Sequence, residues 1–268
     1  MLLRYHYITA LSFSEPVEDQ YFSLLCIPAQ TERQQLLDVN IHVEPEALVG
    51  RDSDGLGNLK VYGVLREPHA DFRLSSSGLA ETKPVLYEEY EDPESIDLFR
   101  YRVPSAFTAP GPDLYALFHA WKDDEPEDVY EKMLYYLKRV HDQLRYDSSA
   151  TDVRTSAEDA VKIGAGVCQD YSHVLLSLLR MAGMPARYVV GLMQGEGESH
   201  AWVEANCRGY WYGIDPTNHL LINESYIKLA HGRDYGDCMI SRGIFRNPRA
   251  IQTMDVSVSV NPVTPDCE

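Results

Sequence analysis

The feature that most constrains this chain is a cysteine that follows two glycines and opens an amphipathic helix. Residues 164–171 read Gly-Ala-Gly-Val-Cys-Gln-Asp-Tyr. Beyond them, apolar residues fall on one stripe of an α-helix, at Val174, Leu175, Leu178, Leu179 and Ala182. Gly183 and Pro185 suit the end of that helix. The pattern predicts Cys168 in or just before the first helical turn, where free backbone N–H groups and the helix dipole favour its thiolate.

Two later segments supply partners for such a thiol, which needs a base and an acceptor that orients the base. Residues 199–205 alternate in the manner of a β-strand, with His200 near the start. A turn at 206–209 leads into a second strand, which ends at Asp215. In an antiparallel pair, the Asp215 carboxylate can hold one imidazole nitrogen of His200 while the other faces Cys168. The spacing therefore predicts a catalytic triad of Cys168, His200 and Asp215.

These motifs resemble the core of the transglutaminase-like superfamily. The runs Gly-Val-Cys168-Gln-Asp-Tyr, Ser-His200-Ala-Trp-Val-Glu and Ile-Asp215-Pro-Thr occur in the family's order and with similar spacing. Three linked motifs are far more specific than a lone cysteine and histidine. The resemblance implies a papain-like α+β core, a Cys-His-Asp triad and no cofactor. It also implies that the run Asp234-Tyr235-Gly236-Asp237 lies near the site.

The rest of the chain divides by composition into three parts. Strand-like segments separated by turn residues predict a small antiparallel β-sandwich domain over residues 1–82, and they resemble the N-terminal β domain of bacterial transglutaminase-like proteins. These segments are 4–13, 21–27, 36–43, 59–65 and 70–76, with a break at 15–19. Residues 83–112 form a connector rich in proline and glutamate. Residues 113–268 are assigned to the catalytic core, with helices at 113–121, 128–144 and 156–161 and a strand at 253–260. Asp113 is the expected cap of the first helix.

Charge and cysteine content exclude several classes of function. The net charge of −17 argues against a basic face for nucleic acid or an anionic membrane. A solvated acidic surface explains this charge, although a cationic substrate stays open. Five cysteines without a Cys-x-x-Cys pair favour reduced thiols in a cytoplasm over a disulfide framework. No segment reads as a signal peptide or a membrane span. No ligand pair has the spacing of a zinc site, so we expect no metal.

The residues favour a cysteine-dependent hydrolase, a peptidase or amidase that cleaves peptide or side-chain amide bonds through a thioester. A transglutaminase with an amine acceptor uses the same chemistry, and a non-enzymatic protein-binding module on the same fold is the third alternative. Each triad residue also has a structural interpretation: Cys168 as a buried thiol, His200 as a strand residue, Asp215 as a turn residue before Pro216. Asp170 fits either the helix dipole or a role in shaping the site. The sequence sets neither the substrate nor the oligomeric state.

Overall fold

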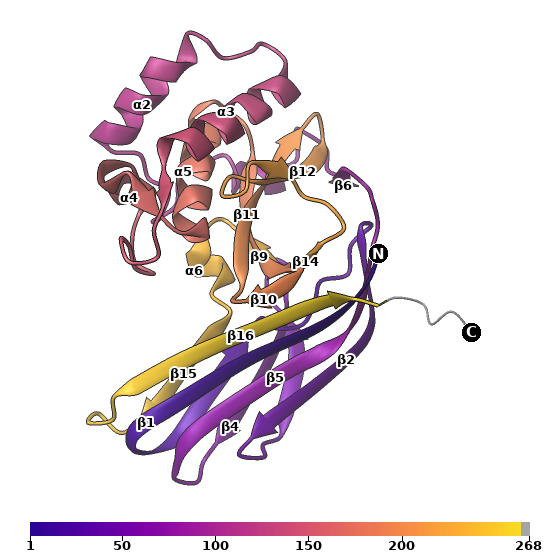
Figure 1. Ribbon diagram of the computed structural model, residues 1–268, viewed down its shortest axis with the longest axis vertical. Helices are drawn as coiled ribbons and strands as arrows, with labels where there is room; N and C mark the ends of the chain where they lie inside the picture. The colour runs from indigo at the N-terminus through magenta and orange to yellow at the C-terminus, as the bar shows by residue number, and fades with distance from the viewer. Residues whose placement is uncertain (264–268) are drawn as a thin grey trace.

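The computed structural model describes residues 1–263. Figure 1 shows a β-rich part below and a helix-rich core above it. The β-rich part is an eight-stranded antiparallel sheet system, and the core holds a six-stranded antiparallel sheet. A short parallel pair joins β7 (Arg145–Tyr146) to β8 (Ala165–Gly166). This is the expected α+β fold, an antiparallel β-sandwich joined to a papain-like core. No helix within residues 1–263 is long and apolar enough to cross a membrane.

One long strand, β1 (Leu2–Leu24), organises the β-rich part. Its first half pairs with β5 (His69–Thr82) and β16 (Gln252–Pro262), and its second half pairs with β4 (Leu59–Leu65) and β15 (Ser241–Arg246). Two outer strands complete the sheets: β2 (Gln34–Glu44) lies beside β5, and β3 (Val49–Ser53) lies beside β4. The strand β1 thus runs from one layer of the sandwich into the other.

The segment expected as a break between two strands is instead an irregular stretch within β1. The register shifts between Ser12 and Val17 and again between Glu18 and Tyr21, and Asp19 has a positive φ of 49°. A β-bulge bends a strand and increases its twist without ending the pairing. Pro16 and the charged residues around it therefore mark a bend between sheets and not a chain reversal.

The last two strands depart from the expectation that residues 113–268 form a single catalytic core. The strand expected near 253–260 exists, but β16 pairs with β1 from Leu3↔Pro262 to Phe13↔Gln252. Strand β15 also pairs with β1. Both strands therefore lie in the sheets of the β-rich part. Alternation along a sequence identifies a strand but not its partner, because pairing is set by the rest of the fold.

The core is built around α5 (Cys168–Met181), which is buried along most of its length. The helix packs against the six-stranded sheet on one side and against α2, α3 and α4 on the other. The sheet consists of β6 (Tyr87–Tyr90), β9 (Ala186–Met193), β11 (His200–Cys207), β12 (Tyr210–Asp215), β13 (Leu220–Leu221) and β14 (Tyr226–Gly232). The covering helices are α2 (Pro112–Lys122), α3 (Val129–Gln143) and α4 (Ala157–Ile163). Short elements complete the chain: α1 (Ile96–Phe99), β10 (Gly195–Gly197) and α6 (Tyr235–Cys238).

The starts of the covering helices show how local sequence fixes them. Asp128 caps α3, and its carboxylate accepts from the backbone N–H groups of Tyr130 and Glu131 at 2.9 and 3.1 Å. Helix α2 begins one residue earlier than expected, so Asp113 lies inside it and does not cap it. The carboxylate of Glu158 in α4 accepts from the N–H groups of Gly111, Asp113 and Leu114 at 2.8–3.0 Å. A long-range carboxylate thus satisfies the helix start that a local cap was expected to satisfy.

A buried ion cluster ties the strands of the core sheet together. The Glu204 carboxylate on β11 lies 2.6 Å from Arg187 Nε on β9 and 2.8 Å from Lys228 Nζ on β14. Lys228 also contacts Glu88 of β6 at 3.2 Å. Burial would raise the pKa of Glu204, but the charges of Arg187 and Lys228 outweigh it and lower that pKa. The cluster holds the strand of His200 against its neighbours.

Candidate active site

Cys168 is the first residue of α5, where the sequence places it. The helix start is capped by Asp170 alone: its Oδ2 accepts from the backbone N–H of Val167 at 2.8 Å and from Thr151 Oγ1 at 2.6 Å. A Cβ on Gly166 would lie 2.4 Å from Asp170 Oδ2, so only glycine leaves room for that carboxylate. Burial raises the pKa of Asp170. Asp170 therefore shapes the turn that presents Cys168, which the helix dipole alone does not explain.

His200 and Asp215 meet across the antiparallel pair of β11 and β12. His200 Nε2 lies 2.7 Å from Asp215 Oδ2, and Asp215 is fully buried. The Asp215 carboxylate also accepts from the backbone N–H groups of Thr217 and Asn218 at 2.8 and 3.1 Å. Asn218 Nδ2 and the Tyr226 hydroxyl donate to it at 2.8 and 2.9 Å. Burial would raise the pKa of Asp215, but these donors, with His200 foremost, lower it.

The imidazole of His200 is strongly basic in this setting. Burial would lower its pKa, but hydrogen bonding to Asp215 and interaction with Cys168 outweigh burial and raise the pKa to about 10. Since Nε2 is bound to Asp215, Nδ1 is the nitrogen left for the thiol. The Trp202 ring lies stacked beside the imidazole, with centroids 6.5 Å apart. A protonated imidazole next to a sulfur favours the thiolate, which is the nucleophilic form of cysteine.

Cys168 and His200 line a cleft of about 540 Å³. A second hollow of about 250 Å³ continues from the same two side chains toward the β-rich part. Both hollows share the loop residues Glu198 and Ser199, so they are two halves of one cleft. The structure thus brings the sulfur, the imidazole and the buried carboxylate together at one opening, and the glycine-rich loop before His200 borders it as the sequence indicates.

The cysteines other than Cys168 within residues 1–263 are buried and in their reduced form. Burial raises the pKa of Cys26 and of Cys207 to about 12, and it raises the pKa of Cys238 well above its ordinary value. These thiols are therefore poor nucleophiles at neutral pH. Within residues 1–263, no group of three or more His, Cys, Asp or Glu side chains has the geometry to hold a metal ion.

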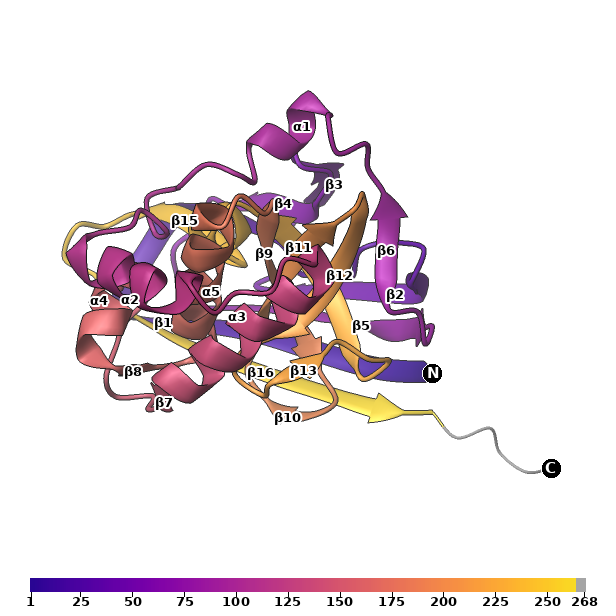
Figure 2. The ribbon, with the colours of Figure 1, turned by 90° about the horizontal axis from the view of Figure 1, so that it is seen from above.

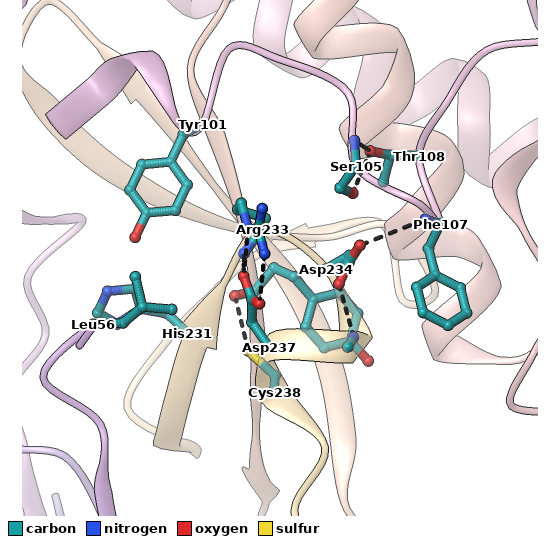
Figure 3. A network of polar contacts seen from close by, with 12 residues as sticks. Leu56, Tyr101, Ser105, Phe107, Thr108, His231, Arg233, Asp234, Asp237 and Cys238 are labelled. Carbon is teal, nitrogen blue, oxygen red and sulfur yellow. Dashed lines mark hydrogen bonds and ion pairs between the residues drawn. The ribbon is translucent and has the colours of Figure 1, made fainter. Parts of the chain in front are cut away.

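The run from Asp234 to Asp237 lies beside the cleft, as its resemblance to the family implies, but its carboxylates bind groups outside the triad. Figure 3 shows Asp237 against Arg233 and Asp234 turned toward the backbone of Phe107. Asp237 binds Arg233 Nε and Nη2 at 2.8 and 3.0 Å. Tyr235 is the member of the run that lines the hollow next to Cys168. The two aspartates therefore fix the loop that carries Tyr235.

Sequence reasoning missed Asn218 and Tyr226, which bind the carboxylate of Asp215 from a turn and from another strand. Asn218 comes three residues after Asp215, so an Asx-type turn after Pro216 is a local signal for it. Tyr226 gives no such signal, because it reaches Asp215 only through the pairing of β14 with β9.

The helix-covered sheet with a Cys–His–Asp constellation at one edge defines a papain-like α+β core, and comparisons with known proteins identify its family. The Transglutaminase-like superfamily model matches residues 120–216. The model of the Bacterial transglutaminase-like N-terminal region matches residues 3–81. Residues 120–216 are therefore similar to the transglutaminase-like core, and residues 3–81 are similar to the N-terminal region of its bacterial members.

Relatives of similar length occur in mycobacteria. An uncharacterized protein of Mycobacterium leprae (strain TN) is 28% identical over 277 residues, which cover 96% of this chain and 98% of that protein. One from Mycobacterium bovis is 25% identical over 293 residues, covering 96% and 92%. A crystal structure described as a "Putative Cysteine Protease from Cytophaga hutchinsonii" has a TM-score of 0.78 and 24% identity, and the match covers 99% of this chain and 93% of that one. The same fold therefore extends over the β-rich part and the core together.

Proposed function

We propose that this protein is a cysteine-dependent hydrolase that cleaves peptide or side-chain amide bonds. The observation that carries the proposal is His200, held by the buried Asp215 at 2.7 Å and lining one cleft with a cysteine at a helix start. A buried thiol would not open onto a cleft. If Asp215 only formed a turn, it would not need five hydrogen-bond donors. If His200 served only the strand, it would not line the cleft together with the thiol of Cys168.

The mechanism follows from the positions of the protons. His200 holds the proton of the Cys168 thiol, and the thiolate attacks the amide carbonyl carbon. The backbone N–H of Cys168, at the start of α5, is placed to donate to the oxyanion. The imidazolium then protonates the leaving amine as the C–N bond breaks, and a thioester remains. His200 next takes a proton from water, which attacks the thioester, releases the acid and restores the thiol.

Hydrolysis is proposed over amine transfer because the cleft is open to solvent. Two cleft residues, Tyr146 and Met254, are 60% and 53% exposed. Transfer to an amine requires that water be kept from the thioester, whereas hydrolysis requires that water reach it. The transglutaminase alternative is tested by offering a labelled primary amine: product that carries the label in place of free acid would overturn hydrolysis.

The proposal is tested by alkylation of Cys168 with iodoacetamide at pH 6–9, read by mass spectrometry. We expect the wild type to react at neutral pH and the His200→Ala variant to react more slowly by at least about tenfold. Covalent adducts from a set of peptide and γ-glutamyl amides, trapped on Cys168 by acid quenching, would then identify the acyl group. An unreactive Cys168 in folded wild-type protein at neutral pH would contradict the proposal and leave the protein-binding module.

A further inference from the structure

The strand β16 has an open edge beside the cleft. One edge of β16 pairs with β1 over its whole length, and the other pairs with β10 only between Val258 and Val260. Figure 2 shows β10 next to β16 at the margin of the molecule. From Gln252 to Ser257, no strand within residues 1–263 pairs with this second edge. Its backbone N–H and C=O groups are available to another extended chain.

The same strand forms part of the cleft wall. Met254 and Val256 line the hollow next to Cys168, and Val258 lines the larger hollow. Residues two apart on a strand point to the same face, so these three side chains form one row along the cleft. Tyr7 of β1 lines the hollow beside them. The β-rich part therefore supplies an apolar wall for the candidate site.

The rim of the cleft carries several exposed apolar side chains. Four large apolar side chains that line it are exposed: Tyr146 at 60%, Val153 at 58%, Met254 at 53% and Met193 at 37%. Exposed apolar groups gathered around an opening mark a contact with a larger partner. A small free amide would leave most of this rim uncovered.

The open edge also lacks two features that proteins often use to protect a strand edge, lysine and proline. Residues 252–257 read Gln-Thr-Met-Asp-Val-Ser and contain neither lysine nor proline. The charged residue in this run is Asp255, and alternation places its side chain on the face opposite Met254 and Val256. Nothing on the cleft face of the strand repels an added chain with apolar side chains.

We propose that residues 252–257 are the docking strand for an extended peptide segment of the substrate. The segment lies in line with β10, forms strand hydrogen bonds with the edge of β16, and places alternate apolar side chains against Met254 and Val256. The substrate class is then an unfolded or flexible stretch of polypeptide, and not a free amino-acid amide. This inference rests on the proposed hydrolase, because it uses the same cleft.

The test compares electrophiles that react with Cys168. The probes are an acetylated tetrapeptide of alternating serine and leucine that ends in a chloromethyl ketone, and the same tetrapeptide with a chloroacetyl group at its amino end. The two probes place the peptide on opposite sides of the thiol. Chloroacetone is the small counterpart of the chloromethyl ketone, and chloroacetamide is the small counterpart of the chloroacetyl peptide. We expect at least one peptide probe to alkylate Cys168 about tenfold or more faster than its counterpart, which corresponds to about 1.4 kcal/mol.

Two changes separate docking on β16 from unspecific binding. N-methylation of alternate peptide amides removes the N–H donors on one side of the peptide strand. We expect the alkylation rate to drop to that of the small counterpart when the amides that face β16 are methylated, and not when the other set is methylated. Met254→Asp is expected to abolish the advantage of the peptide probe, while Asp255→Asn, on the opposite face, retains it. In the peptide adduct, amide hydrogens within residues 252–257 should exchange more slowly than in the carbamidomethyl adduct.

The outcomes distinguish this inference from the function on which it rests. Small electrophiles that alkylate Cys168 while both peptide probes show no advantage would overturn the docking strand and leave the hydrolase intact. An advantage that survives both N-methylation at every position and Met254→Asp would also overturn it. A Cys168 that reacts with none of the four reagents would overturn the hydrolase itself.

Discussion

Replacement of Asp215 by asparagine tests the electrostatic logic of the site most directly. The pKa of His200 is raised from 6.5 to about 10, and a shift of that size corresponds to roughly 5 kcal/mol of preference for the imidazolium. Asp215 and Cys168 share this effect, so loss of the carboxylate charge removes on the order of half of it. The NH2 group of the asparagine cannot accept the hydrogen bonds that the Asp215 carboxylate accepts. Buried donors are then left unpaired, at a cost of about 1–3 kcal/mol each.

The sign of the effect follows from the pKa of His200. The wild-type imidazole stays protonated up to a pH near 10, so it carries a positive charge beside the sulfur of Cys168 throughout the neutral range. In Asp215→Asn the imidazole loses its proton at a lower pH, so the thiol must ionise with less help. We expect the pH at which Cys168 becomes reactive to rise, and amide hydrolysis at pH 7 to fall on the order of a hundred- to ten-thousandfold.

The assay is the pH dependence of the iodoacetamide rate constant, with thermal unfolding measured alongside to confirm that each variant is folded. Tyr226→Phe is the graded control, because it removes the donor that lies 2.9 Å from Asp215 and keeps the carboxylate and the ring. It should change the profile far less than Asp215→Asn does. A folded Asp215→Asn protein with the wild-type pH profile would refute the assignment of Asp215 as the residue that makes His200 basic.

Three further predictions concern the surroundings of the site. Gly166→Ala should lower both stability and Cys168 alkylation, since a Cβ there lies 2.4 Å from Asp170 Oδ2; unchanged melting and alkylation would contradict the tight turn. Glu204→Gln should lower the free energy of unfolding at pH 7 by about 3–5 kcal/mol in urea titrations, because it leaves buried cations unpaired. The folded pKa of Glu204 lies below its ordinary 4.5, so the wild type loses this stability as pH falls below that value, and the gap between the two proteins should narrow in acid. Burial lowers the pKa of His173 from 6.5 to about 3. The free energy of unfolding should therefore decrease as the pH falls from 6.5 to 3, because the unfolded chain binds a proton that the folded protein does not. A folded His173→Gln protein should show a smaller decrease.

The candidate triad could be predicted from the sequence because each of its parts is a local pattern. A cysteine before an apolar stripe, a histidine on an alternating strand and an aspartate at the end of the next strand can all be read in short windows. The antiparallel pairing of β11 with β12, joined by the turn at 206–209, then brings His200 to Asp215. His200 and Asp215 were placed together because a single turn joins their strands, whereas the pairing of Cys168 with His200 was inferred from the chemistry that a thiol requires.

The features that sequence reasoning missed depend on partners far away along the chain. Glu158 caps α2 from another helix, and Tyr226 reaches Asp215 from a strand on the far side of β9. The alternating residues of β16 predict a strand, but its place beside β1 depends on the whole sandwich. Strand β3 was missed because its residues, Val-Gly-Arg-Asp-Ser, lack the aromatic and β-branched character of a strand.

The pairing of β1 with β16 has a consequence for the order in which the cleft is assembled during synthesis. The ribosome makes β1 first and β16 last, and the register joins Leu3 to Pro262. Until residues 252–262 leave the exit tunnel, the nascent chain carries an unfilled place beside β1, and its cleft lacks the wall formed by Met254 and Val256. The cleft therefore becomes complete only after residues 252–262 have been synthesised and have paired with β1.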